Sequence, residues 1–270
     1  MKKTALLFFV LFIAKINFAQ TVAATRAANF GLGQNISNWL ERGFDSDWPR
    51  PNVYTKADLQ KMKDAGIKSL RLPACFERIT DTIAPYYVDT NHVLFSYIDS
   101  VISWANELNM NVTIDNHHLW DSITNTAWRT QEQRFTHMWA VVANHYAYLD
   151  PERYTFELWN EPNLTFAADS LRILFSEAID SIRQFAPNHT IIVSPNLGSE
   201  GFTYSSAYLP FADTNLIYTW HCYDPLDFTH QGFTWESPYF PVGTTFPTNN
   251  PSVFSQFLPL SLSSVQDWIA

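Results

Sequence analysis

The strongest constraint on the fold is a repeated alternation between short apolar runs and longer amphipathic stretches. The short runs predict strands at residues 29–33, 67–72, 111–115, 154–159, 190–194 and 216–223. The longer stretches carry apolar residues three and four positions apart, which predicts helices at residues 56–65, 93–108, 131–148 and 168–185. Strands that alternate with helices form parallel sheets, because each helix returns the chain to the edge where the next strand starts.

Polar residues gather directly after several of these predicted strands, which favours an α/β fold of the TIM (β/α)8 barrel type. In such a barrel the loops at the carboxyl ends of the strands form the active site. Only six of the eight β/α units are recognisable, so we expect an open barrel that lacks its C-terminal strands and has a gap beside the sixth. A doubly wound open sheet is the alternative, although no glycine-rich phosphate loop follows the first predicted strand.

The first 19 residues have the features of a secretory signal peptide. Lys2 and Lys3 precede an apolar stretch at residues 5–14, and Ala19 is a small residue at the expected cleavage point. The apolar stretch is short for a membrane span, which needs roughly 20 residues, and Lys15 ends it. We expect export to the extracellular space or the periplasm, with residues 20–270 forming one barrel domain that does not contact a membrane.

Composition restricts the kind of ligand. With 17 basic and 26 acidic side chains the net charge is −9, which disfavours nucleic acids and anionic membranes as partners. Aromatic residues make up 16% of the chain, more than a core of this size needs, so some rings are expected to line a cleft for a flat, ring-shaped ligand. The two cysteines, Cys75 and Cys222, are too few for a disulfide scaffold, and the sequence does not say whether they pair.

The segment F-E-L-W-N-E-P-N, residues 156–163, is the most informative for chemistry. An apolar strand ends in Asn160 and Glu161, and Pro162 then stops the strand, which holds two polar groups at the rim of a sheet. A carboxyl group there can act as a general acid if partial burial raises its pKa towards neutrality. Taken alone, the pair could equally be an ordinary strand-to-loop junction with a solvated Glu161.

Three other strand ends present polar side chains in the same way. Arg71 lies in S-L-R-L-P, His117 and His118 end T-I-D-N-H-H, and His221 and Tyr223 lie in T-W-H-C-Y-D-P. Each alone is explained by an ion pair or by packing. Their expected gathering on one face of one barrel is better explained by a functional site.

These motifs, in this order and spacing, resemble glycoside hydrolase family 5, the family of many cellulases. The resemblance runs from about residue 31 to residue 232 and includes G-L-G-Q-N-I-S-N-W-L-E, S-L-R-L-P, T-I-D-N-H-H, L-W-N-E-P, T-I-I-V-S-P-N and H-C-Y-D-P-L-D-F-T-H-Q-G. It implies that Glu161 is the general acid/base. The substrate-contacting or supporting residues that it implies are Arg71, His117, Asn160, His221 and Tyr223.

The resemblance also implies a second carboxylate that this chain does not contain. In the family the nucleophile is a Glu at the end of the seventh strand, and a Trp after the eighth forms part of the sugar platform. The chain ends at Ala270, before both. Glu200 and Glu236 lie in loops but not in the family's motif. We therefore expect a truncated piece of the enzyme that is inactive as it stands.

The expected activity is that of a retaining endo-β-1,4-glucanase acting on cellulose-type β-glucans, without a cofactor. Trp120 and Trp235 follow strands and are the best candidates for sugar stacking. A β-mannanase of the same family and a non-catalytic carbohydrate-binding barrel remnant are the alternatives. A zinc site is disfavoured because His221 has no second ligand at close spacing, and a Ser-His-Asp hydrolase because no G-x-S-x-G motif occurs.

Overall fold

The structure is a computed structural model of the chain. It describes residues 21–42, 45–118, 128–162, 168–194, 211–219, 221, 223, 225–234 and 239–245. The predicted signal peptide, Cys222 and residues 260–269 lie outside the described residues.

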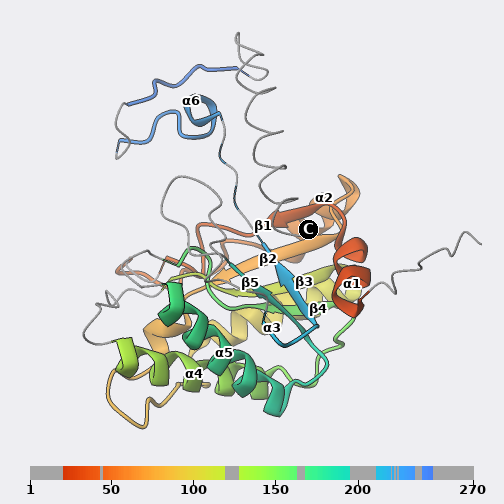
Figure 1. Ribbon diagram of the computed structural model, residues 1–270. Helices are drawn as coiled ribbons and strands as arrows, with labels where there is room; N and C mark the ends of the chain where they lie inside the picture. Colours follow the sequence, from red (N-terminus) through yellow and green to blue (C-terminus); the bar gives the residue numbers. More distant parts are fainter. Residues whose placement is uncertain are drawn as a thin grey trace, which may run out of the picture.

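Six parallel strands form one sheet in which every strand lies beside its neighbours in sequence, as Figure 1 shows. The strands are β1 (Gly33–Asn35), β2 (Ser69–Ala74), β3 (Asn111–Asn116), β4 (Tyr154–Glu157), β5 (Thr190–Val193) and β6 (Leu216–Tyr218). This arrangement confirms the predicted α/β-barrel fold class. Among the described residues β1 and β6 do not pair with each other, so the barrel is open between its first and sixth strands, as expected.

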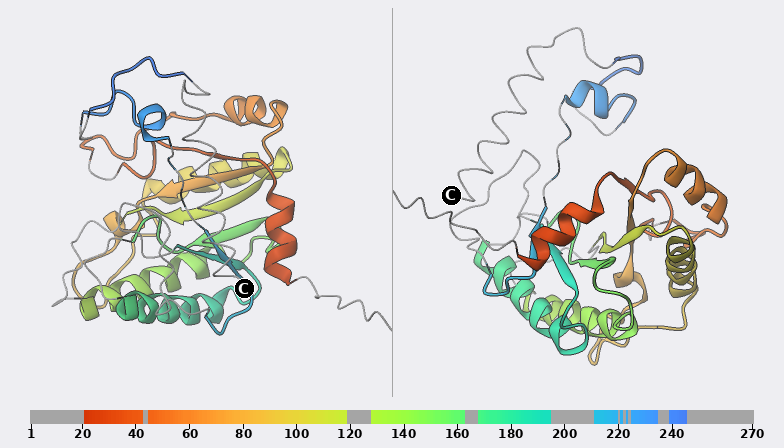
Figure 2. Two further views of the ribbon diagram at one scale, coloured as in Figure 1. Left: turned by 45° about the horizontal axis from the view of Figure 1, so that its top comes forward. Right: turned by 90° about the vertical axis from the view of Figure 1, so that its right-hand side faces the viewer.

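The placement of the first predicted strand was wrong. Residues 29–33 were expected to be extended, but helix α1 (Val22–Phe30) includes the first two of them and β1 starts only at Gly33. The side chain of Thr21 caps α1 by accepting a hydrogen bond from the Ala24 amide at 3.1 Å. Buried Arg26 then binds Glu152 at 2.6 Å and Thr190 at 3.1 Å. Glu152 precedes β4 and Thr190 is the first residue of β5, so α1 lies across the amino-terminal ends of the strands (Figure 2).

Helices cover the outer face of the sheet (Figure 2). They are α2 (Lys56–Asp64), α3 (Val93–Glu107), α4 (Trp128–His145) and α5 (Ala168–Phe185), and a 3-10 turn, η1 (Phe76–Ile79), follows β2. The sequence predicted all four of these helices, with ends that differ by at most three residues. A capping box between Thr55 and Asp58 starts α2, and Lys61 and Lys63 in its last turn favour the carboxyl end of the helix dipole.

Alternation along the strands separates the core from the barrel interior. Leu72, Ile114 and Phe156 are fully buried in the apolar core, and Trp39 and Trp159 are also buried there. Side chains one position away in each strand point to the opposite face of the sheet. The interior-facing set that lines a cavity includes Arg71, Thr113, Glu157, Ile192 and Ile217.

The stretch from residue 224 to 259 contains six prolines, which disfavour a regular helix or a central strand. Its described part contains one short helix, α6 (Leu226–Thr229), and otherwise no helix or strand.

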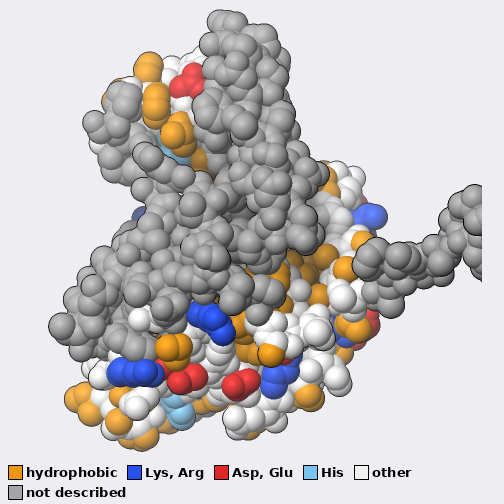
Figure 3. Space-filling view, in the orientation of Figure 1, with side chains coloured by type: hydrophobic (Ala, Val, Ile, Leu, Met, Phe, Trp, Pro, Cys, Tyr) orange, Lys and Arg blue, Asp and Glu red, His pale blue; other side chains and the backbone are white. Residues whose placement is uncertain are grey.

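Acidic and basic side chains lie beside one another on the helical side of the molecule, at the bottom of Figure 3. None of the helices within the described ranges has the length and apolarity needed to cross a membrane.

Candidate active site

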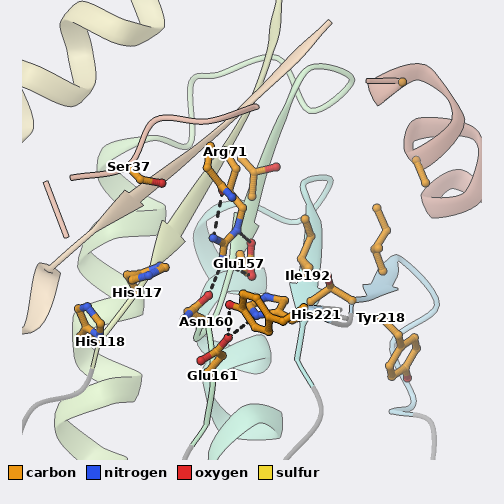
Figure 4. A pocket seen from close by; sticks show the side chains of 17 residues that line it. Ser37, Arg71, His117, His118, Glu157, Asn160, Glu161, Ile192, Tyr218 and His221 are labelled. Carbon is orange, nitrogen blue, oxygen red and sulfur yellow. Dashed lines mark hydrogen bonds and ion pairs between the residues drawn. The ribbon is translucent and has the colours of Figure 1, made fainter. Parts of the chain in front are cut away.

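A cavity of about 960 Å³ opens at the carboxyl ends of the strands and continues through the barrel interior to α1. Six of the residues predicted from the sequence line it together: Arg71, His117, Asn160, Glu161, His221 and Tyr223. Figure 4 shows Arg71, Glu157, Asn160, Glu161 and His221 in one column, with His117 and His118 to one side. The predicted stacking residues Trp120 and Trp235, and the loop carboxylates Glu200 and Glu236, lie outside the described residues.

Glu161 follows β4 and accepts two hydrogen bonds on one oxygen. His221 Nδ1 lies 2.5 Å from Glu161 Oε1, and the Tyr223 hydroxyl donates to the same atom at 2.9 Å. The His221 contact, helped by Tyr223 and opposed by burial, lowers the pKa of Glu161 to about 2. A general acid requires a pKa raised towards neutrality, and the present arrangement does not meet this condition because the two donors outweigh desolvation.

Arg71 in β2 connects the site to the barrel interior. Its Nε and Nη2 donate to the two carboxylate oxygens of Glu157 at 2.7 and 2.8 Å, a bidentate geometry. Nη2 also donates to Asn160 Oδ1 at 2.8 Å and lies 3.0 Å from Asp115 Oδ2. Since an arginine can only donate, the Asn160 amide must turn its oxygen inwards, which leaves its Nδ2 group for the cavity.

Asp115 and Glu157 are site residues that the sequence motifs missed. They are register partners on β3 and β4, and both are almost fully buried. Burial raises the pKa of Glu157 and Asp115 adds to the rise, while Arg71 opposes it. For Arg71, burial works against the charge, but Asp115 and Glu157 outweigh it and raise the pKa. The sequence signal for both was an acid inside an apolar strand, which requires a buried partner.

His117 and His118 follow β3, which ends at Asn116. They are therefore outside the strand and do not alternate between its two faces. Both line the cavity, with ring centroids 4.7 Å apart and ring planes at 82°. His117 Nδ1 lies 2.6 Å from Asp115 Oδ2. Burial lowers the pKa of His118 to about 4, with a further contribution from His117, so His118 is neutral near pH 7.

Tyr223 keeps its hydroxyl proton over the whole physiological range. Burial and the negative charge of Glu161 raise its pKa to about 12. The described parts of the chain contain no group of three His, Cys, Asp or Glu side chains arranged to hold a metal ion. Cys75 is buried, whereas Cys222 lies outside the described residues.

Fold and site together define an α/β-barrel protein with an Asn–Glu pair at the carboxyl end of its fourth strand. The profile of the cellulase family, glycosyl hydrolase family 5, matches residues 32–259. The chain therefore belongs to this family, as its motifs suggested.

Proteins with similar sequences support the same family assignment. Endoglucanase 3 of Fibrobacter succinogenes is 33% identical over 218 residues, a match that covers 75% of this chain and 32% of the relative. Cellodextrinase A of Ruminococcus flavefaciens is 24% identical, with 77% of this chain and 63% of the relative covered. The chain thus spans less than two thirds of the length of these curated relatives.

Solved structures share the fold. Thermotoga maritima Cel5A in complex with a mannotriose substrate superposes with a TM-score of 0.77 at 26% identity, covering 90% of this chain and 76% of that one. The Clostridial cellulose synthase subunit Z from Clostridioides difficile gives a TM-score of 0.74 at 28% identity, with 87% and 75% covered.

Proposed function

We propose that this chain is the catalytic part of a secreted, retaining endo-β-1,4-glucanase, with Glu161 as general acid/base. The observation that carries the proposal is the convergence of Asn160, Glu161, Arg71 and His221 on one cavity at the carboxyl ends of parallel strands. A sugar chain bound there would meet a carboxyl group for the leaving oxygen and an amide Nδ2 group for the 2-hydroxyl of the reacting sugar.

A retaining mechanism needs a second carboxylate about 5–5.5 Å from the first. We propose that chain following residue 270 in the complete protein supplies this nucleophile. Its negative charge would raise the pKa of Glu161 from about 2, and it would compete for the Tyr223 hydroxyl that now stabilises the Glu161 carboxylate. Both effects would allow Glu161 to hold the proton that a general acid donates.

The guanidinium of Arg71 is suited to supporting that nucleophile. Its Nε and Nη2 groups are occupied by Glu157 and Asn160, whereas Nη1 makes only a long contact of 3.3 Å, to Asn35 Oδ1, within the described residues. A carboxylate approaching Nη1 would be held ionised, which is the state that attacks an anomeric carbon.

The test compares this chain with a version extended past residue 270, on carboxymethylcellulose and on mannan. The extended chain should release reducing sugar from carboxymethylcellulose, the present chain should not, and NMR of the first product should show retention at the anomeric carbon. Glu161→Gln in the extended chain should lose roughly 10³-fold in kcat. The matched change Glu107→Gln, at an exposed ion pair with Lys56, should have no effect. Activity of the present chain alone would contradict the proposed origin of the nucleophile.

Two other functions give different results in the same assays. Cleavage of mannan but not of carboxymethylcellulose would establish the β-mannanase alternative, and the mannotriose complex of the Thermotoga maritima relative is the observation in its favour. Retardation in a glucan gel without reducing-sugar release from the extended chain would establish a carbohydrate-binding barrel instead. Stacking by Trp120 and Trp235 is part of each of these proposals, and Trp→Ala changes there should weaken binding.

Secretion is a separate part of the proposal. Residues 1–19 have the composition of a signal peptide. Expression of the complete coding sequence in its host, followed by N-terminal sequencing of the exported protein, should give a first residue at or near Gln20. A product that remains in the cytoplasm with an intact N-terminus would contradict this.

A further inference from the structure

Asp115 lies on the inner face of β3 and contacts two cavity residues with a single oxygen. Its Oδ2 is 2.6 Å from His117 Nδ1 and 3.0 Å from Arg71 Nη2. The side chain is fully buried, and its other oxygen, Oδ1, has no hydrogen-bond partner in the described structure. Asp115 therefore does not face the cavity itself, but it touches two side chains that do.

The location of Asp115 is costly for folding. Its register partner on β4 is Glu157, so two carboxylates lie side by side in the barrel interior. Like charges directly opposite in a sheet are destabilising, and a buried carboxylate loses its hydration. Among the side chains that the structure describes, only Arg71 forms ion pairs with both acids, and on β5 the residue in register with Glu157 is the apolar Ile192. Packing alone would favour an apolar residue at position 115.

The contact with His117 determines which nitrogen of the ring carries the proton. An ionised carboxylate can only accept hydrogen bonds, so Nδ1 must be the protonated nitrogen. The neutral ring then has a lone pair on Nε2, and this is the nitrogen left for a ligand in the cavity. Asn160 lines the same cavity and offers its Nδ2 donor because Arg71 occupies its oxygen.

We propose that Asp115 is a positioning residue that holds His117 as the Nδ1–H tautomer and so makes Nε2 a hydrogen-bond acceptor for a sugar hydroxyl. The inference rests on the proposed function for the identity of the ligand. With Asn160 as donor and His117 as acceptor, the floor of the site matches hydroxyl groups, which both donate and accept. A protein without Asp115 would no longer hold His117 Nε2 as an acceptor in the cavity that the Asn160 donor lines, although it would keep every residue that touches the sugar.

The test is a long-range ¹H–¹⁵N NMR experiment on this chain with labelled histidine at pH 7.5. Wild-type His117 should show a protonated Nδ1 and an unprotonated Nε2. Asp115→Ala should shift the ring towards the Nε2–H form. Asp115→Asn should preserve Nδ1–H, because its carbonyl can replace Oδ2 while its NH₂ group occupies the unpartnered Oδ1 position. The control Asp213→Ala removes the partner of Arg183 at another ion pair and should leave His117 unchanged.

Binding of cellotriose, measured by calorimetry on the same proteins, provides the functional readout. Asp115→Ala should weaken binding at least tenfold, whereas Asp115→Asn and Asp213→Ala should stay within threefold of wild type. An Nε2–H tautomer in the wild-type chain overturns the proposal without any variant, and so does full-strength binding by Asp115→Ala. Absence of cellotriose binding by every protein, with the tautomers as expected, would count against the proposed function and leave the tautomer assignment supported.

Discussion

Arg71→Met should be the most destabilising single change in the barrel interior. It removes the cation that contacts Glu157 at 2.7 and 2.8 Å and Asp115 at 3.0 Å, and the two acids are 3% and 0% exposed. Breaking a buried pair by removing one partner costs about 3–5 kcal/mol, because a buried charge is left uncompensated. We expect a loss of about 4 kcal/mol, equivalent to about 10 °C in Tm for a chain of this length.

Urea unfolding followed by tryptophan fluorescence measures the effect, and two comparisons identify its cause. The double variant Arg71→Met/Glu157→Gln should be more stable than Arg71→Met alone, because it no longer buries an unpaired Glu157. The penalty should also be smaller at pH 5 than at pH 8, since the raised pKa of Glu157 favours its protonation as the pH falls.

Lys56→Met, which breaks an exposed ion pair with Glu107, is the matched control and should cost less than about 1 kcal/mol. A cost for Arg71→Met as small as that of the control, or one that does not change with pH, would refute the reasoning that Arg71 compensates buried negative charge.

Three further predictions concern other contacts. Tyr223→Phe should raise the pKa of Glu161 above about 2, and His221→Ala should raise it further, as measured by ¹³C NMR titration of the carboxyl carbon. Burial lowers the pKa of His189 to about 4, below the usual value of about 6.5, so stability should be greatest above pH 6.5 and decline towards pH 4. His189→Phe should flatten that decline in urea midpoints. Arg26→Met should release α1 from the strand ends, and limited proteolysis should then cut near residue 26.

Local pattern was sufficient for most of the barrel. The apolar runs at β2 to β6 and the three-and-four spacing of α2, α3, α4 and α5 are properties of neighbouring residues, so their positions could be predicted to within a few residues. The ends of two of these strands were misjudged. The expected strands at 154–159 and 216–223 end earlier, at Glu157 and Tyr218, so His221 and Tyr223 lie outside β6.

Helix α1 could not be predicted in the same way. Its sequence V-A-A-T-R-A-A-N-F carries one basic side chain, and Arg26 is stabilised by Glu152 and Thr190, which are 126 and 164 residues away. Such partners do not appear in any local window. The helix could not be predicted because the contacts that stabilise it join residues far apart in sequence. These contacts form only once the strand ends are assembled.

The sequence by itself determined which residues are candidates for the site, because Arg71, His117, Asn160, Glu161 and the pair His221 and Tyr223 all follow or lie in recognisable strands. Only the tertiary structure decided their state. It brought two hydrogen-bond donors to Glu161, which lowers the pKa of this proposed general acid. It also brought Asp115 on β3 beside Glu157 on β4. Protonation depends on the charges and donors within a few ångströms of a group, and those neighbours come from strands and loops that are far apart in the sequence.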